Sequence, residues 1–352
     1  VFHHLVTDGW SMRILVRELT SLYLAFHRGE PSPLDPTGLH YADWAAWQRA
    51  WLARGEFERQ IEYWRRTLAG VEPLALPIDR ARGATRALHG ASVSFAMETT
   101  ESSALLAFLR AEGATLFEAM LAAMQIGLAR LAGTNDLVIG TPIANRNAPG
   151  CESIVGYFAN TLALRGRVEP GASFRELLRA ARATTLEAHA HQDVPFEAIV
   201  DAVAPARDLT RNPLFEAMLV VQHAEETLET PEGLLVETRA VPLDATPFDL
   251  TWSVAQSGES IFGALEFDAT LFAPETATRW LALFRRILDL GARQPDQPLE
   301  ALPLADPLDH AIVTASNRTR VERPFRSLAA RIAESAARAP HAIAIVDEDH
   351  AY

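Results

Sequence analysis

Two adjacent histidines, His3 and His4, stand four residues ahead of the pair Asp8–Gly9. A neutral imidazole carries one donor and one acceptor nitrogen, and its pKa lies near neutrality. It can therefore take a proton from an incoming amine or hydroxyl, or hold that nucleophile in place. Neighbouring side chains of an extended segment point to opposite sides. We therefore expect one histidine to react and the other to support the loop.

The residues around this loop predict the elements that position it. Apolar residues precede the histidines, and apolar residues at three- and four-residue spacing follow over 11–28. This pattern predicts the end of a strand at residues 1–2, a tight loop and the start of a helix. Asp8 can bond loop amides or pair with a distant cation, and Gly9 permits a close backbone approach. Because adjacent histidines point apart and no partner follows at helical spacing, the pattern does not predict a metal site.

Composition limits the class of protein. The 352 residues are 49% hydrophobic and 22% charged, which is enough material for two or more domains with a core. The net charge of −13 argues against nucleic acid or an anionic membrane as a partner. The single cysteine, Cys151, excludes a disulfide framework, and no apolar run is long enough to span a membrane. We expect a cytoplasmic protein, and its ends predict an excerpt of a longer polypeptide.

Periodicity predicts alternating helices and strands. The expected helices are 11–28, 40–52, 57–68, 102–112, 115–132, 173–191, 276–290 and 325–338, and the expected strands are 93–97, 136–144, 218–222, 234–241, 248–255, 261–267 and 342–346. Residues 71–90 have no periodicity and predict a crossing between two lobes. The Pro-rich stretch 294–309 predicts an unpatterned linker.

Five stretches resemble, in order, the motifs of one family. Residues 3–9 resemble the HHxxxDG motif of the condensation domains of nonribosomal peptide synthetases, and Trp10-Ser11-Met12 resembles the subclass that joins two L-configured units. The other four stretches are Tyr63-Trp64-Arg65, residues 140–146 with 155–161, HQDVPFE at 191–197 and RNPLF at 211–215. The resemblance covers about the first 305 residues.

The resemblance implies an α/β fold, the two-lobe sandwich similar to chloramphenicol acetyltransferase. Residues 1–75 would be the remainder of a partial N-terminal lobe that carries the histidine loop. Residues 76–305 would be a complete C-terminal lobe, followed by a linker over 306–320. Residues 321–352 resemble the start of an adenylation domain.

The resemblance also implies an acyltransferase that forms a peptide bond. A donor acyl or peptidyl thioester on one carrier protein would be attacked by the amine of an acceptor aminoacyl thioester on the next. Both groups would hang on 4′-phosphopantetheine arms supplied by the donor and acceptor peptidyl carrier proteins. The adenylation domain would adjoin in cis, and neither a metal nor a directly bound cofactor is required.

By resemblance, His4 stands at the centre of the reaction, where it would take a proton from the attacking amine or hold that amine in line. The amide of Gly9 would stabilise the oxyanion. The catalytic motif comprises His3, His4, Asp8 and Gly9, and the supporting residues are Arg146, Trp10 and Ser11. A pair between Asp8 and Arg146 would fasten the loop, whereas His191, in the last turn of a helix that Pro195 ends, is expected to be structural.

Several alternatives stay open. An epimerisation domain uses the same histidine motif, and a dual condensation and epimerisation domain or an ester-forming variant is also compatible with these residues. A third class is a non-catalytic domain of the same fold that recruits partner enzymes. The continuation Trp10-Ser11 and the adenylation-like end favour condensation. The identities of donor and acceptor, and the choice between proton transfer and positioning by His4, are not decided by the sequence.

Overall fold

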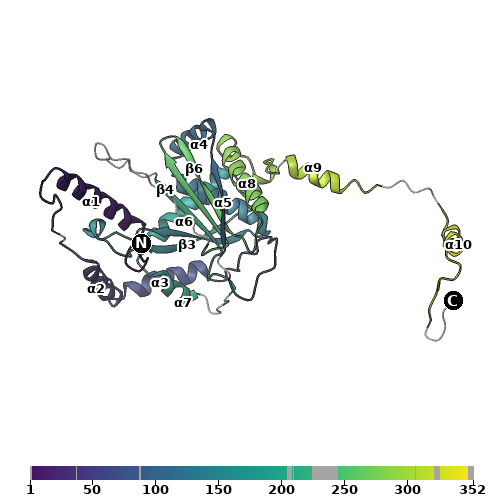
Figure 1. Ribbon diagram of the computed structural model, residues 1–352, viewed down its shortest axis with the longest axis horizontal. Helices are drawn as coiled ribbons and strands as arrows, with labels where there is room; N and C mark the ends of the chain where they lie inside the picture. The colour runs from purple at the N-terminus through teal and green to yellow at the C-terminus, as the bar shows by residue number, and fades with distance from the viewer. Residues whose placement is uncertain are drawn as a thin grey trace. The chain divides into compact units, whose positions relative to one another are not determined.

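The computed structural model describes residues 2–36, 38–86, 89–203, 208, 210–223, 245–305, 307–320 and 326–347 (Figure 1). The chain divides into two units, Val1–Leu304 and Ala305–Tyr352. The histidine loop and all the strands described below lie in the first unit. The strand expected over 234–241 lies outside the described residues.

Six strands form one open mixed sheet in the order β1-β6-β5-β4-β2-β3. The strands are β1 (Gly90–Ala96), β2 (Asp136–Ile143), β3 (Asn160–Arg167), β4 (Ala217–His223), β5 (Leu250–Ser257) and β6 (Ser260–Asp268). Strand β4 runs parallel to both β2 and β5, and the outer pairs are antiparallel. The predicted hairpin between β5 and β6 is confirmed: Ser257 pairs with Ser260, and Gly258 takes the positive φ that so short a turn needs.

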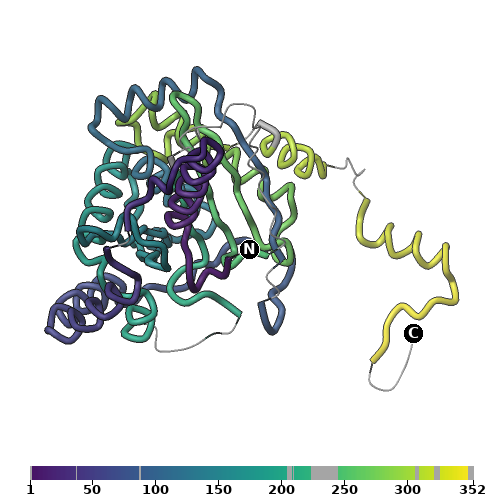
Figure 2. Tube along the Cα trace, turned by 60° about the vertical axis from the view of Figure 1, so that its left-hand side comes forward, coloured from purple at the N-terminus to yellow at the C-terminus, as the bar shows by residue number. Residues whose placement is uncertain are grey.

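Four of the eight α-helices described in the first unit cover one face of this sheet. The eight are α1 (Gly9–His27), α2 (Tyr41–Leu52), α3 (Glu56–Leu68), α4 (Thr99–Glu112), α5 (Leu116–Ala132), α6 (Phe174–Ala190), α7 (Phe196–Val203) and α8 (Pro274–Arg293). Helices α4, α5, α6 and α8 cover one face of the sheet, and α3 packs on α7 near β3 (Figures 1 and 2). The predicted capping boxes that open α5 and α6 are both formed.

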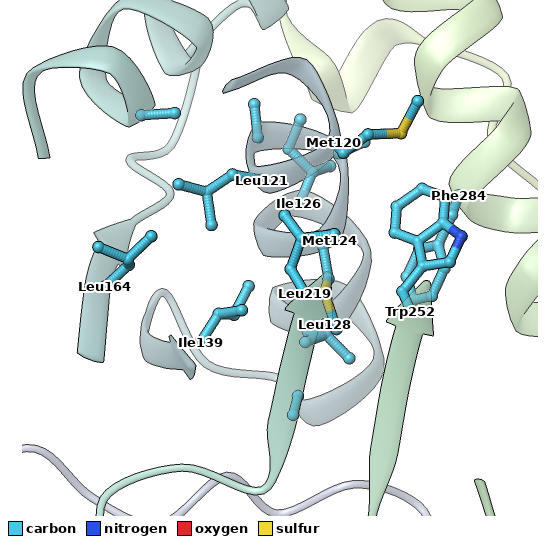
Figure 3. Close-up of a cluster of buried hydrophobic side chains, with 14 of the residues drawn as sticks. Met120, Leu121, Met124, Ile126, Leu128, Ile139, Leu164, Leu219, Trp252 and Phe284 are labelled. Atoms are coloured by element: carbon cyan, nitrogen blue, oxygen red, sulfur yellow. The ribbon is translucent and has the colours of Figure 1, made fainter. Parts of the chain in front are cut away.

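Helix α5 is the centre of the core, because its residues from Glu118 to Ala129 are all buried. Its Met124 and Leu128 are fully buried beside the strands, as Figure 3 shows. Trp252 of β5 stacks on Phe284 of α8 with ring centroids 5.0 Å apart. Helix α8 comes this close because Gly127 has no side chain: a Cβ there would lie 2.3 Å from the Phe284 ring.

Among the described strands and α-helices of the first unit, β3 and α7 were not predicted. Strand β3 carries charged Arg165 and Arg167 beside Gly166, which breaks the pattern of a buried strand. The structure accommodates Arg165 because its guanidinium pairs with Asp136 of β2 and donates to the carbonyl oxygens of Thr67 and Ala69 at the end of α3. Partners distant in sequence therefore decide this strand.

Three expectations at or near the ends of the chain were wrong. Phe2, predicted to lie at the end of a strand, has no regular structure, and residue 1 lies outside the described residues. The stretch 294–309, predicted as an unpatterned linker, instead contains a short 3₁₀ helix, Leu299–Ala301, and buries Leu299, Leu302 and Leu304 in the core. The third is the strand predicted over 342–346 in the second unit, because residues 343–345 have no regular structure. The helices of this unit are α9 (Pro307–Ser316) and α10 (Leu328–Arg338).

Candidate active site

The histidine loop is anchored by Asp8, the N-cap of α1. Its carboxylate accepts a hydrogen bond from the amide of Ser11 at 2.8 Å and one from the amide of Phe158 at 3.0 Å. The first bond satisfies a donor that the start of any helix leaves unpaired. The second ties the loop to the stretch just before β3. Asp8 therefore fixes both the start of α1 and the position of the loop on the fold.

The cation expected opposite Asp8 is present. The Nη2 atom of Arg146 lies 3.1 Å from Oδ1 of Asp8, and both side chains are almost fully buried. Its Nη1 atom donates to the carbonyl oxygens of Cys151 and Ile154, both at 2.6 Å. Arg146 follows β2, and the short 3₁₀ helix Cys151–Ser153 folds back over its guanidinium. The pair thus joins the loop before α1 to the segment between β2 and β3.

Ser11 completes this polar cluster. Its hydroxyl accepts from Nη2 of Arg146 at 2.9 Å and lies 2.8 Å from the carbonyl oxygen of Gly156, to which it donates. The Gly156 amide also approaches the same hydroxyl at 3.0 Å. Ser11 is fully buried, so these contacts replace the water that it loses. Ser11 and Arg146 therefore bond to each other and to backbone groups rather than to solvent.

The electrostatics favour a charged Asp8. Burial alone would raise the pKa of the Asp8 carboxyl, but hydrogen bonds from Ser11 and the Phe158 amide, together with the charge of Arg146, hold that pKa below its ordinary value. The carboxylate is therefore ionised at neutral pH. An ionised, buried and fully bonded carboxylate acts as a support and is poorly placed to exchange protons with a substrate.

The two histidines hold opposite tautomers when neutral. Nδ1 of His4 lies 2.6 Å from the carbonyl oxygen of Thr7, and a carbonyl only accepts, so Nδ1 carries the proton and Nε2 the lone pair. In contrast, the amide of Leu5 donates to Nδ1 of His3 at 3.1 Å, which places the proton of His3 on Nε2. Both side chains are exposed. His4 alone therefore offers an acceptor nitrogen at Nε2.

The backbone at His3 and His4 is not the extended segment that the sequence predicted. Residues 4–6 form a turn, closed by a hydrogen bond of 3.0 Å from the Val6 amide to the His3 carbonyl oxygen. The argument from alternating side chains therefore does not apply here. The roles of the two rings are separated by their hydrogen bonds and not by opposite directions along a strand.

Gly9 and Trp10 form the first turn of α1. No atom lies within 4 Å of the place where a Cβ of Gly9 would be, so this residue leaves open space beside the helix start. Nε1 of Trp10 donates to the carbonyl oxygen of Glu152 at 2.9 Å, and the guanidinium of Arg13 lies 4.5 Å from the Trp10 ring. Trp10 therefore braces α1 against the same segment that Arg146 holds.

The motif stretches at 63–65 and 191–197 contact each other. The His191 ring stacks on Tyr63 with centroids 3.9 Å apart, its Nδ1 atom lies 2.8 Å from the carbonyl oxygen of Glu187, and its own carbonyl oxygen accepts from Nε1 of Trp64. These contacts join α3 to the end of α6, and a structural role for His191 stays a prediction. Asn160 donates to the carbonyl oxygens of residues 192 and 194. The motifs at 63–65, 157–161 and 191–197 therefore form one cluster.

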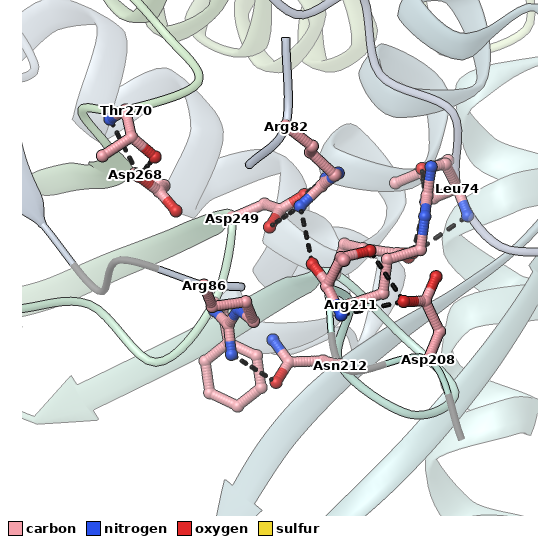
Figure 4. Close-up of polar contacts among 12 residues, drawn as sticks. Leu74, Arg82, Arg86, Asp208, Arg211, Asn212, Asp249, Asp268 and Thr270 are labelled. Atoms are coloured by element: carbon pink, nitrogen blue, oxygen red, sulfur yellow. Dashed lines mark hydrogen bonds and ion pairs between the residues drawn. The ribbon is translucent and has the colours of Figure 1, made fainter. Parts of the chain in front are cut away.

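The RNPLF stretch belongs to a second polar network (Figure 4). Arg211 donates to Glu216 at 2.8 Å, and Glu216 also accepts from the amide of Leu74 at 3.1 Å. Arg82 pairs with the fully buried Asp249. These contacts fasten residues 71–86, part of the stretch 71–90 that was predicted as a crossing, to the sheet, and Leu74 and Leu76 enter the main core.

Sequence reasoning missed one residue beside the histidines. The ring of Tyr157 lies against His4 with centroids 5.0 Å apart and an interplanar angle of 73°. Its place between Gly156 and Phe158, in a motif stretch already singled out, was the available signal.

Within the described ranges, no group of three or more His, Cys, Asp and Glu side chains could hold a metal ion. None of the described helices has the length and apolar character of a membrane span.

The open sheet with helices on one face and an anchored histidine loop defines an α/β protein of the chloramphenicol-acetyltransferase-like class, and this confirms the predicted fold. Residues 1–311 match the family described as Condensation domain. The chain belongs to the condensation domains of nonribosomal peptide synthetases.

Two relatives illustrate the similarity. The chain is 37% identical over 353 residues to malpibaldin synthetase of Mortierella alpina, covering 99% of this chain and 6% of that protein. It is 38% identical over 355 residues to phosphinothricin tripeptide synthetase PhsC of Streptomyces viridochromogenes, covering 99% of this chain and 32% of that protein. The chain therefore spans less than a third of the length of either relative.

Solved structures agree with the fold. The X-domain from teicoplanin biosynthesis has a TM-score of 0.77 and 28% identity, covering 85% of this chain and 70% of that one. The four-domain nonribosomal peptide synthetase AB3403, bound to AMP and glycine, has a TM-score of 0.82 and 21% identity, covering 100% of this chain and 28% of that one.

Proposed function

We propose that this chain forms a peptide bond between a donor acyl or peptidyl thioester and an acceptor aminoacyl thioester, in the manner of domains that join two L-configured units. The observation that carries the proposal is the state of His4. The bond from Nδ1 to Thr7 leaves the lone pair on Nε2 of an exposed ring. The buried Asp8–Arg146 pair holds the loop that presents this ring.

The reaction is an aminolysis. The acceptor amine attacks the carbonyl carbon of the donor thioester and forms the new C–N bond, while the carbonyl electrons move onto oxygen. The amine proton passes to Nε2 of His4. The tetrahedral intermediate then breaks its C–S bond, and the sulfur leaves with the electron pair and takes up the proton. The products are an amide on the acceptor carrier and a free thiol on the donor carrier.

The supporting residues have different tasks in this scheme. The amide of Gly9, in the first turn of α1, is one of the helix N–H groups without an intrahelical partner and would stabilise the oxyanion. Asp8 and Arg146 hold the loop, and Ser11 and Trp10 join it to residues 152–156. The His3 ring accepts a hydrogen bond from the Leu5 amide within the turn.

The partners follow from the same scheme. Both acyl groups would arrive on 4′-phosphopantetheine arms of donor and acceptor carrier proteins, so the chain itself would bind no cofactor. Residues 321–352 would begin an adenylation domain in cis, and residues 1–75 would be the last part of an N-terminal lobe. The site of action would be the cytoplasm, with neither nucleic acid nor membrane as partner.

The test uses an intact module with both carrier proteins, each loaded with a labelled group. Transfer is followed by intact-protein mass spectrometry for wild type, His4→Ala and the control His27→Ala, at the far end of α1. We expect mass to move from donor to acceptor in wild type and in the control. His4→Ala should be slower by a factor of roughly 10² to 10⁴, the usual contribution of a general base.

Two results would replace the proposal. Exchange of the α-proton of the donor for deuterium, without transfer, would indicate epimerisation. Carrier binding without either reaction would indicate a docking domain. That alternative has its own support, because the X-domain from teicoplanin biosynthesis was solved in a complex with OxyB and is 28% identical to this chain.

A further inference from the structure

Tyr157 lies between two residues that bond directly to the histidine loop. Gly156 bonds to the Ser11 hydroxyl through both its carbonyl oxygen and its amide, and the Phe158 amide donates to Asp8. Each of these partners is nearly fully buried. The backbone of Tyr157 is therefore held at a fixed position relative to the loop.

A third contact fixes the same residue from another element. The hydroxyl of Tyr41, at the start of α2, donates to the carbonyl oxygen of Tyr157 at 2.6 Å. The ring of Tyr41 also packs on Phe158, with centroids 5.1 Å apart. Moreover, Gly156 lets the Tyr41 ring approach, since a Cβ at Gly156 would lie 2.3 Å from that ring. Contacts with the start of α1, with α2 and within the segment before β3 thus fix the position of Tyr157.

The hydrogen bond to Thr7 does not by itself fix the orientation of the His4 ring. The single bond from Nδ1 to the Thr7 carbonyl oxygen, at 2.6 Å, sets which nitrogen carries the proton. This one bond does not prevent the imidazole from tilting about its side-chain torsions, and such a tilt would move Nε2 and weaken the bond to Thr7 that sets the tautomer. The Tyr157 ring meets the His4 ring edge to face, at 5.0 Å and 73°, which is the favoured geometry for two such rings.

We propose that Tyr157 is a positioning residue that aims Nε2 of His4 at the acceptor amine; this inference rests on the proposed function. The contact is made by the ring, so the phenol hydroxyl is not required. A misplacement of the reacting nitrogen lowers the rate of the chemical step without weakening the binding of either carrier. Tyr157 therefore affects kcat rather than KM.

A second tyrosine and histidine pair supplies the matched control. Tyr63 stacks face to face on His191 at 3.9 Å, with an interplanar angle of 6°. Tyr63 is buried, and this pair joins α3 to the end of α6. Loss of the Tyr63 ring is therefore expected to lower stability without changing His4.

The experiment compares Tyr157→Phe, Tyr157→Leu and Tyr63→Leu with wild type. Transfer rates are measured in the intact module with both loaded carriers, and thermal unfolding is recorded for each variant. We expect Tyr157→Phe to stay within about twofold of wild type, whereas Tyr157→Leu should lower kcat roughly 10- to 100-fold with KM for the acceptor carrier unchanged. Tyr63→Leu should lower Tm and leave the position of His4 intact.

A second readout does not depend on activity. Nitrogen NMR of ¹⁵N-histidine in the full chain reports the proton on each ring nitrogen, with the His4 signals assigned from their loss in His4→Gln. In wild type and Tyr157→Phe we expect a protonated Nδ1 and an unprotonated Nε2. In Tyr157→Leu the two shifts should move toward each other.

The outcomes separate the two proposals. If wild type transfers and Tyr157→Leu keeps its kcat, or if Tyr157→Phe loses as much as Tyr157→Leu, the role of the Tyr157 ring is overturned. If wild type does not transfer, the proposed function fails. In that case the NMR comparison alone decides whether Tyr157 orders His4, and unchanged shifts in Tyr157→Leu would reject it.

Discussion

The carboxylate of Asp8 and the guanidinium of Arg146 stand 138 residues apart in the sequence and form an ion pair of 3.1 Å. Their side chains are only 3% and 2% exposed, respectively. A buried ion pair contributes little net stability compared with apolar residues, but removal of one partner leaves an uncompensated charge. Loss of either partner therefore leaves a buried charge unpaired and weakens the attachment of the histidine loop.

The first prediction is that either single substitution, Asp8→Leu or Arg146→Met, lowers the free energy of unfolding by about 3–5 kcal/mol. The double variant should lose less than the sum of the two, because neither charge is then left alone. Urea unfolding of the four proteins measures this coupling. The partly exposed pair Arg293–Asp289 of α8, four residues apart on the helix, is the control, and its removal should cost about 0.5 kcal/mol or less. Additive losses at Asp8 and Arg146 would contradict the prediction.

The second prediction concerns pH. Since the pKa of Asp8 is lower in the folded chain than in the unfolded chain, the unfolded chain binds more protons as the solution becomes acidic. The contribution of Asp8 is therefore complete above its ordinary pKa and is lost as pH falls through the lower folded value. The difference in unfolding free energy between wild type and Asp8→Asn should shrink over that acidic range. A difference that is constant with pH would show that Asp8 is not the titrating group.

The third prediction concerns Glu216, whose contribution to stability changes with pH in the direction opposite to that of Asp8. Burial raises the pKa of the Glu216 carboxyl, and Arg211 and the Leu74 amide offset this only in part. The folded chain thus holds this proton more tightly than the unfolded chain does. The contribution of Glu216 is complete below its ordinary pKa and is lost as pH rises through the folded value. Unfolding of Glu216→Gln beside wild type over this range should show their difference falling with pH, and a rising difference would refute the assignment.

The fourth prediction tests the core beneath the site. Gly127→Ala places a methyl group against the Phe284 ring, and overpacking of this kind costs about 1–3 kcal/mol. The double variant Gly127→Ala with Phe284→Leu should lose less than the sum of its parts, because the smaller side chain vacates the space. Chemical unfolding measures both. Unchanged stability in Gly127→Ala would mean that α5 and α8 separate at no cost.

Much of the fold was predictable from local patterns. The helices α3, α5 and α8 follow apolar residues at helical spacing, and the hairpin of β5 and β6 follows from alternation on both sides of Gly258. Strand β3 and helix α7 were missed because their apolar pattern is short and is interrupted by charged or motif residues. The burial of Leu299, Leu302 and Leu304, within a stretch predicted as a linker, was missed because these side chains acquire a partner surface only when the core is assembled.

The candidate site was predictable in part. The residue types around His4 indicated proton transfer, and the resemblance assigned a pair between Asp8 and Arg146. On its residue type alone, an arginine in a polar loop is expected to lie in solvent. Its burial depends on the carbonyl oxygens of Cys151 and Ile154, and on a carboxylate brought from the other end of the first unit. Tyr157 went unnoticed because no local pattern links it to His4.

By itself, the sequence determined the capping boxes, the periodic helices, the hairpin and the order of the motifs, because these depend on residues within a few positions of one another. Only the tertiary structure decided which nitrogen of His4 keeps its lone pair, that Arg146 is buried, and that Tyr157 faces the imidazole. The first depends on the turn that brings Thr7 back to His4, and the others depend on contacts between residues far apart in the sequence. Such contacts form only when the elements pack, so they cannot be read from neighbouring residues.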